Sequence, residues 1–449
     1  MTLAQRWGVG VAAPLACSAA AAVLLVGVSV KAAVAYAVCF VVLCLLVATS
    51  VTPLHKVIVV GVLGLSATVD LIGHFRLGPT TAYAWVTGAV VAIALTAALL
   101  APAGALSSAT HRVLGLMALF PAWAVLSALW APVSLWGAQN LLIYVAFPAL
   151  VAVAAVASST GVLTFSYLRR GMLLALAVAS GLYCISLLMH GLGGSGIVSA
   201  RAYALFAAVG VGWCAALARL GYRVELKAAF LLTGLVFLSL SRTAFITSLV
   251  LLVVGLVGFR TPRDVRRSVA IIVCIGAAAF GIYSYSNPFS ARFSQGDVAT
   301  VAGFRLNVMG RTELWHATWQ DALRHPLLGG GVGTADAVVR RASPSDDNPH
   351  NDYLRAFDDL GVIGFVLLLL MLGAPAFACA RAYRSTPVRD DERRSVHLGA
   401  LLTLLALALG MTTDNPLVYL FVLAPAAVVV GSSLGTRDRG RSGAGRERT

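Results

Sequence analysis

Charged residues are scarce in this sequence. Asp, Glu, Lys and Arg make up 11% of its 449 residues, whereas 59% are hydrophobic. A water-soluble domain carries roughly 25% charged residues, so this composition excludes an ordinary globular protein. The apolar residues also form runs of about 20, the length of helix that crosses a bilayer. The sequence therefore predicts an all-α, polytopic integral membrane protein.

Cysteine is also rare, and none lies in a polar segment. The seven cysteines all fall in apolar runs, without a CxxC pair. We therefore predict neither a disulfide framework nor a zinc site. The simpler interpretation is that the cysteines are small apolar residues that pack between helices. We expect no metal and no cofactor. The cysteines are Cys17, Cys39, Cys44, Cys184, Cys214, Cys274 and Cys379.

Hydropathy predicts about 12–14 transmembrane helices, which divide the chain into four parts. The first run, Val9 to Val30, is too long for a signal peptide, so we interpret it as a retained first span. Residues 226–240 and 243–259 form short spans, either a closely linked hairpin or a broken helix. The four predicted parts are helices over 1–285, a periplasmic catalytic loop over 286–358, closing helices over 359–435 and a basic disordered cytoplasmic tail over 436–449.

The basic residues predict the orientation. With the N-terminus inside, nearly all Lys and Arg of the short loops fall on the cytoplasmic side, and the short outside loops hold only Lys31, Arg76, Arg201 and Arg242. This asymmetry predicts that both termini are cytoplasmic. It also accounts for the net charge of +15, so we expect no nucleic-acid partner.

The segment 286–358 is long, polar and on the outside, with seven arginines. A connection of this length with its own periodic pattern is usually functional. One helix is predicted from Thr312 to His325, with tryptophans suited to the membrane surface. A second is predicted to begin near Asp347 or Asn348 as N-cap, with Pro349 at its first position.

Two features of this loop could carry chemistry. The run Gly329 to Gly333 lacks the Lys-Ser/Thr of a phosphate loop, so a turn is the better interpretation. His350 is predicted in the first turn of a helix, where the macrodipole favours neutral imidazole. A neutral histidine there can act as a general base toward a hydroxyl group. The alternative is an ordinary surface histidine, like His316 and His325 of the same loop.

Several motifs resemble the O-antigen ligase and polymerase family. The histidine motif is His350-Asn351, nine residues, Gly361, two residues and Gly364. Further matches are the runs from Gly310 to Trp315, Pro326 to Gly333 and Leu126 to Ala131, and the step Ser241-Arg242-Thr243. The resemblance extends over most of residues 113–380. One departure is Ala202-Tyr203-Ala204-Leu205, where family members often carry a Pro-Asn pair after an arginine.

The resemblance implies metal-independent glycan transfer at the outer face of the inner membrane. The implied donor is a glycan on undecaprenyl diphosphate. The implied acceptor is a hydroxyl of lipid A-core in ligases, of another glycan in polymerases, or of a protein in O-oligosaccharyltransferases. A transporter or flippase is the alternative from another class, but no internal repeat supports it. The sequence leaves ligase and polymerase open.

The implied diphosphate directs attention to arginine, whose guanidinium binds phosphate through a planar fork. Arg242 lies at the outer end of a span and is the first candidate; Arg311 and Arg201 follow. Snorkelling toward lipid headgroups is the alternative for Arg242. His350, Arg242 and Arg311 are thus the predicted catalytic residues.

The other expected contacts are weaker. Arg201, Asn351, Trp315 and Asp70 are predicted to contact substrate. Asp70 has His74 one turn away near the end of a span, where an ionisable residue indicates function or a local pair at the interface. The run Asp414-Asn415-Pro416 is interpreted as a turn and capping element.

Overall fold

A computed structural model of the chain describes residues 104–132, 134–192, 198–257, 311–344 and 346–446, with residues 298–301, 304–307, 266, 270 and scattered positions between 59 and 101. The predicted spans 9–30, 33–51 and 268–285 lie outside the described residues or nearly so, as do Asp70 and His74. Nothing below concerns their structure.

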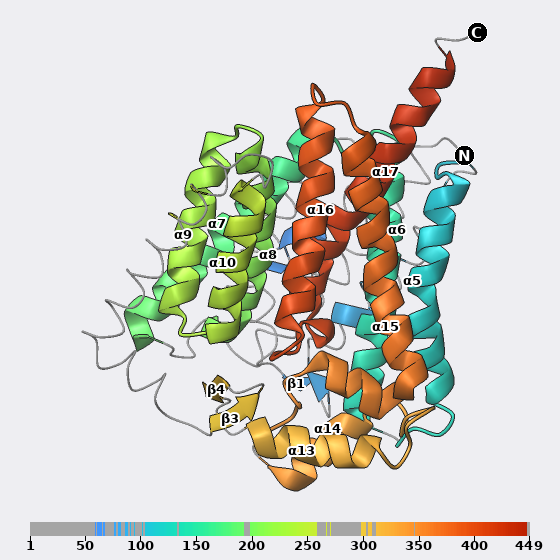
Figure 1. The fold of residues 1–449 in the computed structure, drawn as a ribbon, viewed down its shortest axis with the longest axis vertical. Coiled ribbons are helices and arrows are strands. Elements are labelled where there is room, and N and C mark those ends of the chain that lie inside the picture. The colour runs from blue at the N-terminus through green and yellow to red at the C-terminus, as the bar shows by residue number, and fades with distance from the viewer. Residues whose placement is uncertain are drawn as a thin grey trace.

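The described part of the chain is a helical bundle, which confirms the predicted all-α membrane fold (Figure 1). Six of its helices, α5, α6, α7, α8, α15 and α16, are long and apolar enough to cross a membrane. Two short antiparallel hairpins, β1–β2 and β3–β4, accompany them. The elements are β1 (Arg76–Leu77), β2 (Thr80–Thr81), α5 (Ser108–Ser127), α6 (Leu135–Ser159), α7 (Phe165–His190), α8 (Ala200–Arg219), α9 (Arg223–Leu238), α10 (Arg242–Leu256), β3 (Val298–Val301), β4 (Phe304–Asn307), α13 (Arg311–Ala322), α14 (Thr334–Ala342), α15 (Asp352–Ser385), α16 (Asp391–Gly410), η1 (Pro416–Val418) and α17 (Leu420–Arg446).

Helices α6, α8, α16 and α17 form the centre of the bundle. The apolar part of α8 is almost entirely buried, whereas most of α5, α7 and α15 is not. Helix α17 packs closely along α6, because a side chain at Gly431 would come within 2.3 Å of the Val151 carbonyl oxygen. Lipid gives apolar helices no hydrophobic reason to associate, so close backbone packing of this kind holds them together.

The short spans predicted over 226–240 and 243–259 are two separate helices, α9 and α10. They form the closely linked hairpin, joined by residues 239–241. The broken-helix alternative is therefore wrong. The turn of the hairpin, and with it the start of α10, lies at the end of the bundle from which α8 starts (Figure 1).

Gly361 divides α15 into two parts. Its φ of 67° interrupts the helix, leaving a short arm, Asp352–Leu360, before the membrane-length part. A side chain here would also come within 2.2 Å of the Leu327 carbonyl oxygen. Trp123 of α5 secures the bend by donating a hydrogen bond from Nε1 to the Leu360 carbonyl at 3.0 Å. The first glycine of the histidine motif therefore turns the chain.

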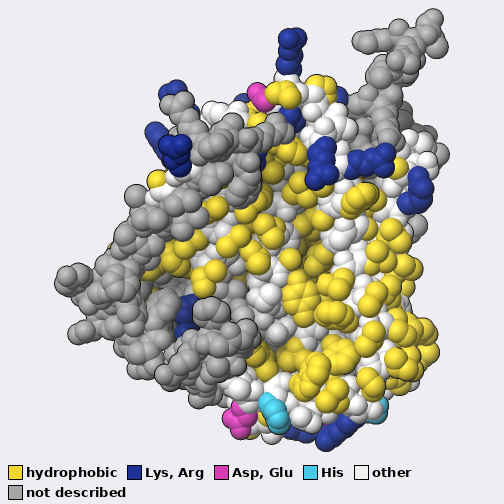
Figure 2. Space-filling view, in the orientation of Figure 1, with side chains coloured by type: hydrophobic (Ala, Val, Ile, Leu, Met, Phe, Trp, Pro, Cys, Tyr) yellow, Lys and Arg dark blue, Asp and Glu magenta, His cyan; other side chains and the backbone are white. Residues whose placement is uncertain are grey.

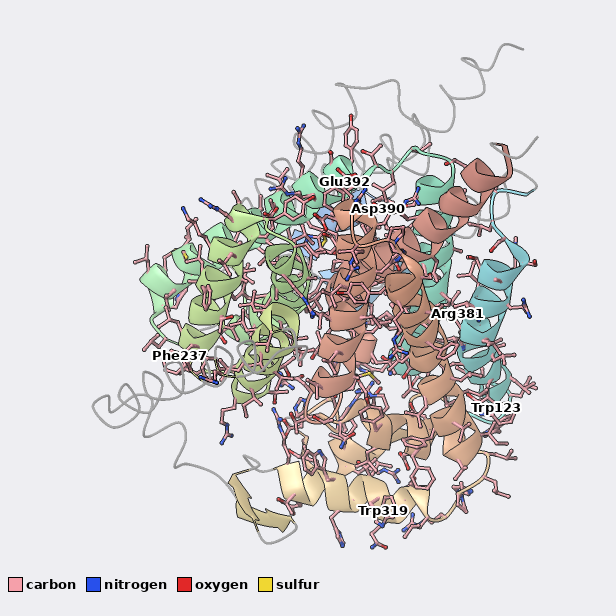
Figure 3. All side chains as sticks on the ribbon, turned by 45° about the horizontal axis from the view of Figure 1, so that its top comes forward. Trp123, Phe237, Trp319, Arg381, Asp390 and Glu392 are labelled. Atoms are coloured by element: carbon pink, nitrogen blue, oxygen red, sulfur yellow. The ribbon has the colours of Figure 1, made fainter. Side chains whose placement is uncertain are left out.

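The short arm of α15 packs with α13 and α14 in a cap at one end of the bundle, defined here as residues 311–360 (Figure 1). The connection 386–390 lies at the opposite end. Figure 2 shows a belt of hydrophobic side chains between two ends that carry the charged ones. Figure 3 places Trp319 in the cap, far from Asp390 and Glu392.

In the cap, the predicted position of the first helix is right, and the predicted start of the second helix is wrong. Helix α13 matches the prediction over 312–325, apart from its last turn. Helix α15 starts later than expected, with Asn351 rather than Asp347 or Asn348 as its N-cap. The reason is that His350 has a φ of 55°, which no helix accommodates, while the Asn348 side chain accepts a hydrogen bond from Arg355. The sequence analysis also missed α14.

The orientation is still a prediction, and the two ends of the bundle offer a test. Cysteines at Ala342 in the cap and at Ser385 near the opposite end both lie at exposed positions. In intact bacterial spheroplasts, an impermeant maleimide should label Ala342→Cys, whereas Ser385→Cys should react only after permeabilisation. The unsubstituted chain is the control for its native cysteines. The reverse pattern would overturn the predicted orientation.

Candidate functional site

His350 lies between α14 and α15 at the contact of the cap with the bundle. Its ring Nδ1 is 2.8 Å from Nη2 of Arg201 and 2.8 Å from Nδ2 of Asn415. These partners come from the start of α8 and from the connection between α16 and α17, so three distant parts of the chain meet at one imidazole. Its positive φ is uncommon for a residue other than glycine and is characteristic of functional sites.

Arg201 is held by Asp414. The Asp414 carboxylate accepts from Arg201 Nη2 at 2.5 Å and from Nε at 2.9 Å, and the carboxylate is almost fully buried while Arg201 is about one-third exposed. Helix α8 begins one residue earlier and is capped by Ser199, whose Oγ accepts from the Ala202 amide at 3.2 Å. The cap and the ion pair together fix the guanidinium beside His350.

Arg311 is the first residue of α13 and also reaches this connection. Its Nη1 donates a hydrogen bond to the Thr413 carbonyl. Burial, together with the positive charges of Arg201 and Arg242, lowers the pKa of Arg311 to about 10, against the opposing effect of Asp414. Among the described residues Arg311 forms no salt bridge. Arg201 and Arg311 therefore place two guanidiniums beside the Asp414 carboxylate.

Arg242 begins α10 on the same side of the bundle. The neighbouring Thr243 hydroxyl lies 2.5 Å from the Thr413 hydroxyl, which joins this helix start to the same connection. The three arginines thus stand in the first turns of three helices, α8, α10 and α13. Helix N-termini carry partial positive charge, so the helices add to the field of the guanidiniums.

This environment keeps His350 neutral. Burial lowers its pKa to about 2, and the charges of Arg201, Arg311 and Arg355 act in the same direction. The cause is therefore burial among arginines, because His350 precedes the N-cap and does not occupy the first turn of α15. From the sequence, a neutral ring was expected because His350 was predicted to lie in the first turn of a helix.

Trp315 and Asn351 shape the loop around His350. Trp315 Nε1 donates to the Pro349 carbonyl at 2.7 Å, and the Asn351 side-chain oxygen accepts from the Leu354 amide at 3.0 Å. Both side chains thus make structural hydrogen bonds on either side of His350. Their expected contacts with substrate stay a prediction, and Asp70 lies outside the described residues.

The segment that contains much of this site also matches a known protein family. Residues 227–369 match the family model described as O-antigen ligase. The matched segment contains Arg242, Arg311 and His350. A search of curated proteins finds no match to the chain.

The match confirms the resemblance to the O-antigen ligase and polymerase family. This family comprises glycosyltransferase-like ligases and polymerases, so the match supports an enzyme of that general kind. Arg201 and residues 413–415 lie outside the matched segment, yet they contact its histidine. The site therefore combines the matched segment with flanking parts of the chain.

A second buried cluster lies behind the candidate site. Arg355 is fully buried, with Nη2 3.3 Å from Asp336 of α14 and Nε 3.6 Å from Asp352. Asp336 also accepts from Asn140 of α6 at 2.7 Å, and Asp352 accepts from the Leu417 amide at 2.7 Å. Burial raises the pKa of Asp336, whereas Arg355 acts to lower it. The cluster joins the cap to the bundle.

The Gly329–Gly333 run is a turn, packed against the short arm of α15. The amides of Gly330 and Gly331 donate to the carbonyls of Asp358 and Asp359 at 2.9 and 2.8 Å. These donors are thus engaged within the protein, which agrees with the turn interpretation. Of the described residues, no three His, Cys, Asp or Glu side chains are arranged to hold a metal ion.

Asp414 and Asn415 are the site residues that the sequence analysis missed as such. It interpreted their run as a turn and capping element, because Asp-Asn-Pro is typical of turns. One feature of the sequence could have indicated their role: Asp414 is a carboxylate in an outside loop, at the same predicted end of the bundle as Arg201 and Arg242. Neither residue is more than 1% exposed.

The Arg355 cluster generates a prediction on stability. Arg355→Ala leaves Asp336 and Asp352 buried without their cation, which should cost about 3–5 kcal/mol and lower the melting temperature of the detergent-solubilised protein. Arg324→Ala is the control, since it breaks an exposed i,i+3 pair with Asp321 that is worth less than about 1 kcal/mol. Equal melting shifts for the two variants would contradict this role of Arg355.

Proposed function

We propose that the chain is an O-antigen ligase of the bacterial inner membrane. It transfers a glycan from undecaprenyl diphosphate to a hydroxyl of lipid A-core. The reaction takes place at the periplasmic face, and both termini are cytoplasmic. No cofactor or metal takes part. The match of residues 227–369 to the O-antigen ligase model supports this proposal.

The observation that carries the proposal is the excess of positive charge around His350. Arg201 and Arg311 lower the pKa of this histidine, and Arg201 and Arg242 lower that of Arg311. Like charges held close together disfavour one another, so this cluster favours an anion that arrives with the substrate. A lipid-linked diphosphate supplies such an anion at the membrane surface, where the cap joins the bundle.

The proposed reaction is a single displacement. The acceptor oxygen forms a bond to the anomeric carbon while the bond to the diphosphate oxygen breaks, and the electron pair leaves with the diphosphate. This course inverts the anomeric centre. The arginines stabilise the charge that develops on the leaving diphosphate, the task that metal ions perform in many phosphoryl sites.

Other acceptors give the alternative functions. A glycan hydroxyl would make the enzyme an O-antigen or exopolysaccharide polymerase, and a protein hydroxyl would make it an O-oligosaccharyltransferase. The donor chemistry is the same in all three. A polysaccharide transporter or flippase is the distant alternative, and the gathering of arginines at one end of the bundle favours an enzyme over it.

The test is transfer by the purified protein in liposomes, with a synthetic lipid-diphosphate glycan, EDTA and no nucleotide. Lipid A-core, a second lipid-linked glycan and an acceptor protein are offered separately. Labelled lipid A-core with inverted anomeric configuration is the expected product. Chain elongation or protein labelling would instead identify the polymerase or the oligosaccharyltransferase. A requirement for added metal would contradict the proposed chemistry.

Arg242 provides a more specific prediction. Arg242→Lys keeps the charge but loses the planar fork, so transfer should fall roughly 10- to 100-fold, as expected for a lost charge-assisted hydrogen bond of about 1.5–3 kcal/mol. Arg340→Lys is the matched control, because Arg340 lies on α14 and stacks on the Trp136 ring. Full activity of folded Arg242→Ala would place the diphosphate elsewhere.

A further inference from the structure

The connection between α16 and η1 contacts Arg201, Arg311 and His350. Thr413 accepts a hydrogen bond from Arg311 through its carbonyl, and Asp414 accepts from Arg201. Asn415 places its side-chain amide 2.8 Å from His350 Nδ1. The Asn415 backbone amide donates to Asp414 at 2.8 Å, which makes the segment rigid. Residues 413–415 therefore set how the histidine is presented.

Arg201 decides which ring nitrogen of His350 carries the proton. A guanidinium has only N–H donors, so the Nδ1 atom 2.8 Å from Arg201 Nη2 must accept. The Asn415 side chain must then present its NH₂ group to the same atom, in agreement with its orientation. The neutral ring consequently carries its single proton on Nε2.

This tautomer is unsuited to general-base catalysis. A base needs a free lone pair, and the Nδ1 lone pair already accepts hydrogen bonds from two donors. A lone pair on Nε2 would require a proton on Nδ1, pointing at the N–H groups of Arg201 and Asn415. In addition, burial and the nearby arginines hold the pKa of His350 near 2, so proton uptake is unfavourable. The expectation that His350 removes the acceptor proton is thus at odds with its surroundings.

We propose that His350 donates a hydrogen bond from Nε2–H to an oxygen of the leaving diphosphate, and that Asp414 and Asn415 are positioning residues that fix this tautomer. This proposal rests on the function proposed above. Among the described residues, every hydrogen bond of the ring ends on Nδ1, so Nε2 is left for the substrate. Donors that face developing negative charge are the most effective form of electrostatic catalysis.

The proton of the acceptor then needs another destination. As its oxygen bonds to the anomeric carbon, the acceptor O–H becomes strongly acidic and its proton passes to water. The electron pair of the broken bond stays on the diphosphate oxygen, where His350 Nε2–H and the arginines stabilise it. Glycosyl transfer has an oxocarbenium-like transition state, so stabilising the charge on the departing diphosphate lowers the barrier directly.

Nitrogen-15 NMR of the histidine-labelled protein in nanodiscs tests the tautomer without any substrate. The difference between wild type and His350→Gln assigns the ring. We expect a protonated Nε2 and an unprotonated Nδ1 from pH 5 to 8. Asp414→Asn should produce a mixture of tautomers, whereas Asp321→Asn, far from the ring, should not. A proton on Nδ1, or a charged ring at pH 5, would overturn the proposal. The charged or titratable groups near the ring are Arg201, Arg242, Arg311, Arg355, Asp346, Asp414 and Tyr419.

Transfer rates give an independent test. His350→Ala should lose about 100- to 1,000-fold, as expected for removal of one transition-state donor. His350→Gln keeps an N–H at the place of Nε2–H and should exceed the Ala variant by at least about tenfold, while a base model predicts that Gln is as poor as Ala. If wild type transfers glycan to no acceptor, the proposed function fails, and the NMR result still decides the tautomer.

Discussion

The ion pair between Arg201 and Asp414 is the interaction on which the site depends. It joins residues 213 positions apart, one at the start of α8 and one after α16. A carboxylate as buried as Asp414 needs a partner, and Arg201 provides it with three hydrogen-bond contacts. Because Asp414 is held in this way, its neighbours Thr413 and Asn415 are placed against Arg311 and His350. Without the pair, the arginine and the histidine would lose their shared geometry.

The arginines near His350 repel one another, and the contacts that hold the cap to the bundle offset this repulsion. Three arginines and three helix N-termini converge at one end of the bundle, and Arg201 and Arg242 both lower the pKa of Arg311. Behind them, Arg355 lies among the buried acids Asp336 and Asp352, and this cluster ties the cap to α6 and to η1. A rigid support allows a site to keep groups in an unfavourable environment that substrate binding relieves. The positive φ of His350 is a further sign of such strain.

Composition and periodicity were sufficient for the membrane fold and for the cap helix α13, because each depends on local patterns. For residues 226–259 they left a hairpin and a broken helix open. The alternation of spans also predicted that Arg201, Arg242 and the His350 loop share one end of the bundle. The start of α15 was predicted wrongly, since a favourable cap sequence at Asp347–Pro349 was overridden by tertiary contacts of Asn348 and His350. The partners of His350 could not be predicted, because hydrogen bonds between residues 149 positions apart leave no local pattern.

The protonation of His350 illustrates the same limit. Its neutrality was expected from a helix dipole, but its tautomer depends on two donors from remote segments. Residue type alone therefore suggested a base, whereas the neighbourhood indicates a donor. This distinction matters for the mechanism, because a donor at His350 acts on the leaving diphosphate, whereas a base would act on the acceptor hydroxyl.

The most direct test is a cryo-EM structure of the protein with a non-transferable lipid-diphosphate glycan analogue. The account predicts diphosphate density among Arg201, Arg242 and Arg311, with one phosphate oxygen about 2.7–3.2 Å from His350 Nε2. Diphosphate bound away from these arginines, or an acceptor hydroxyl rather than a phosphate oxygen on Nε2, would contradict it.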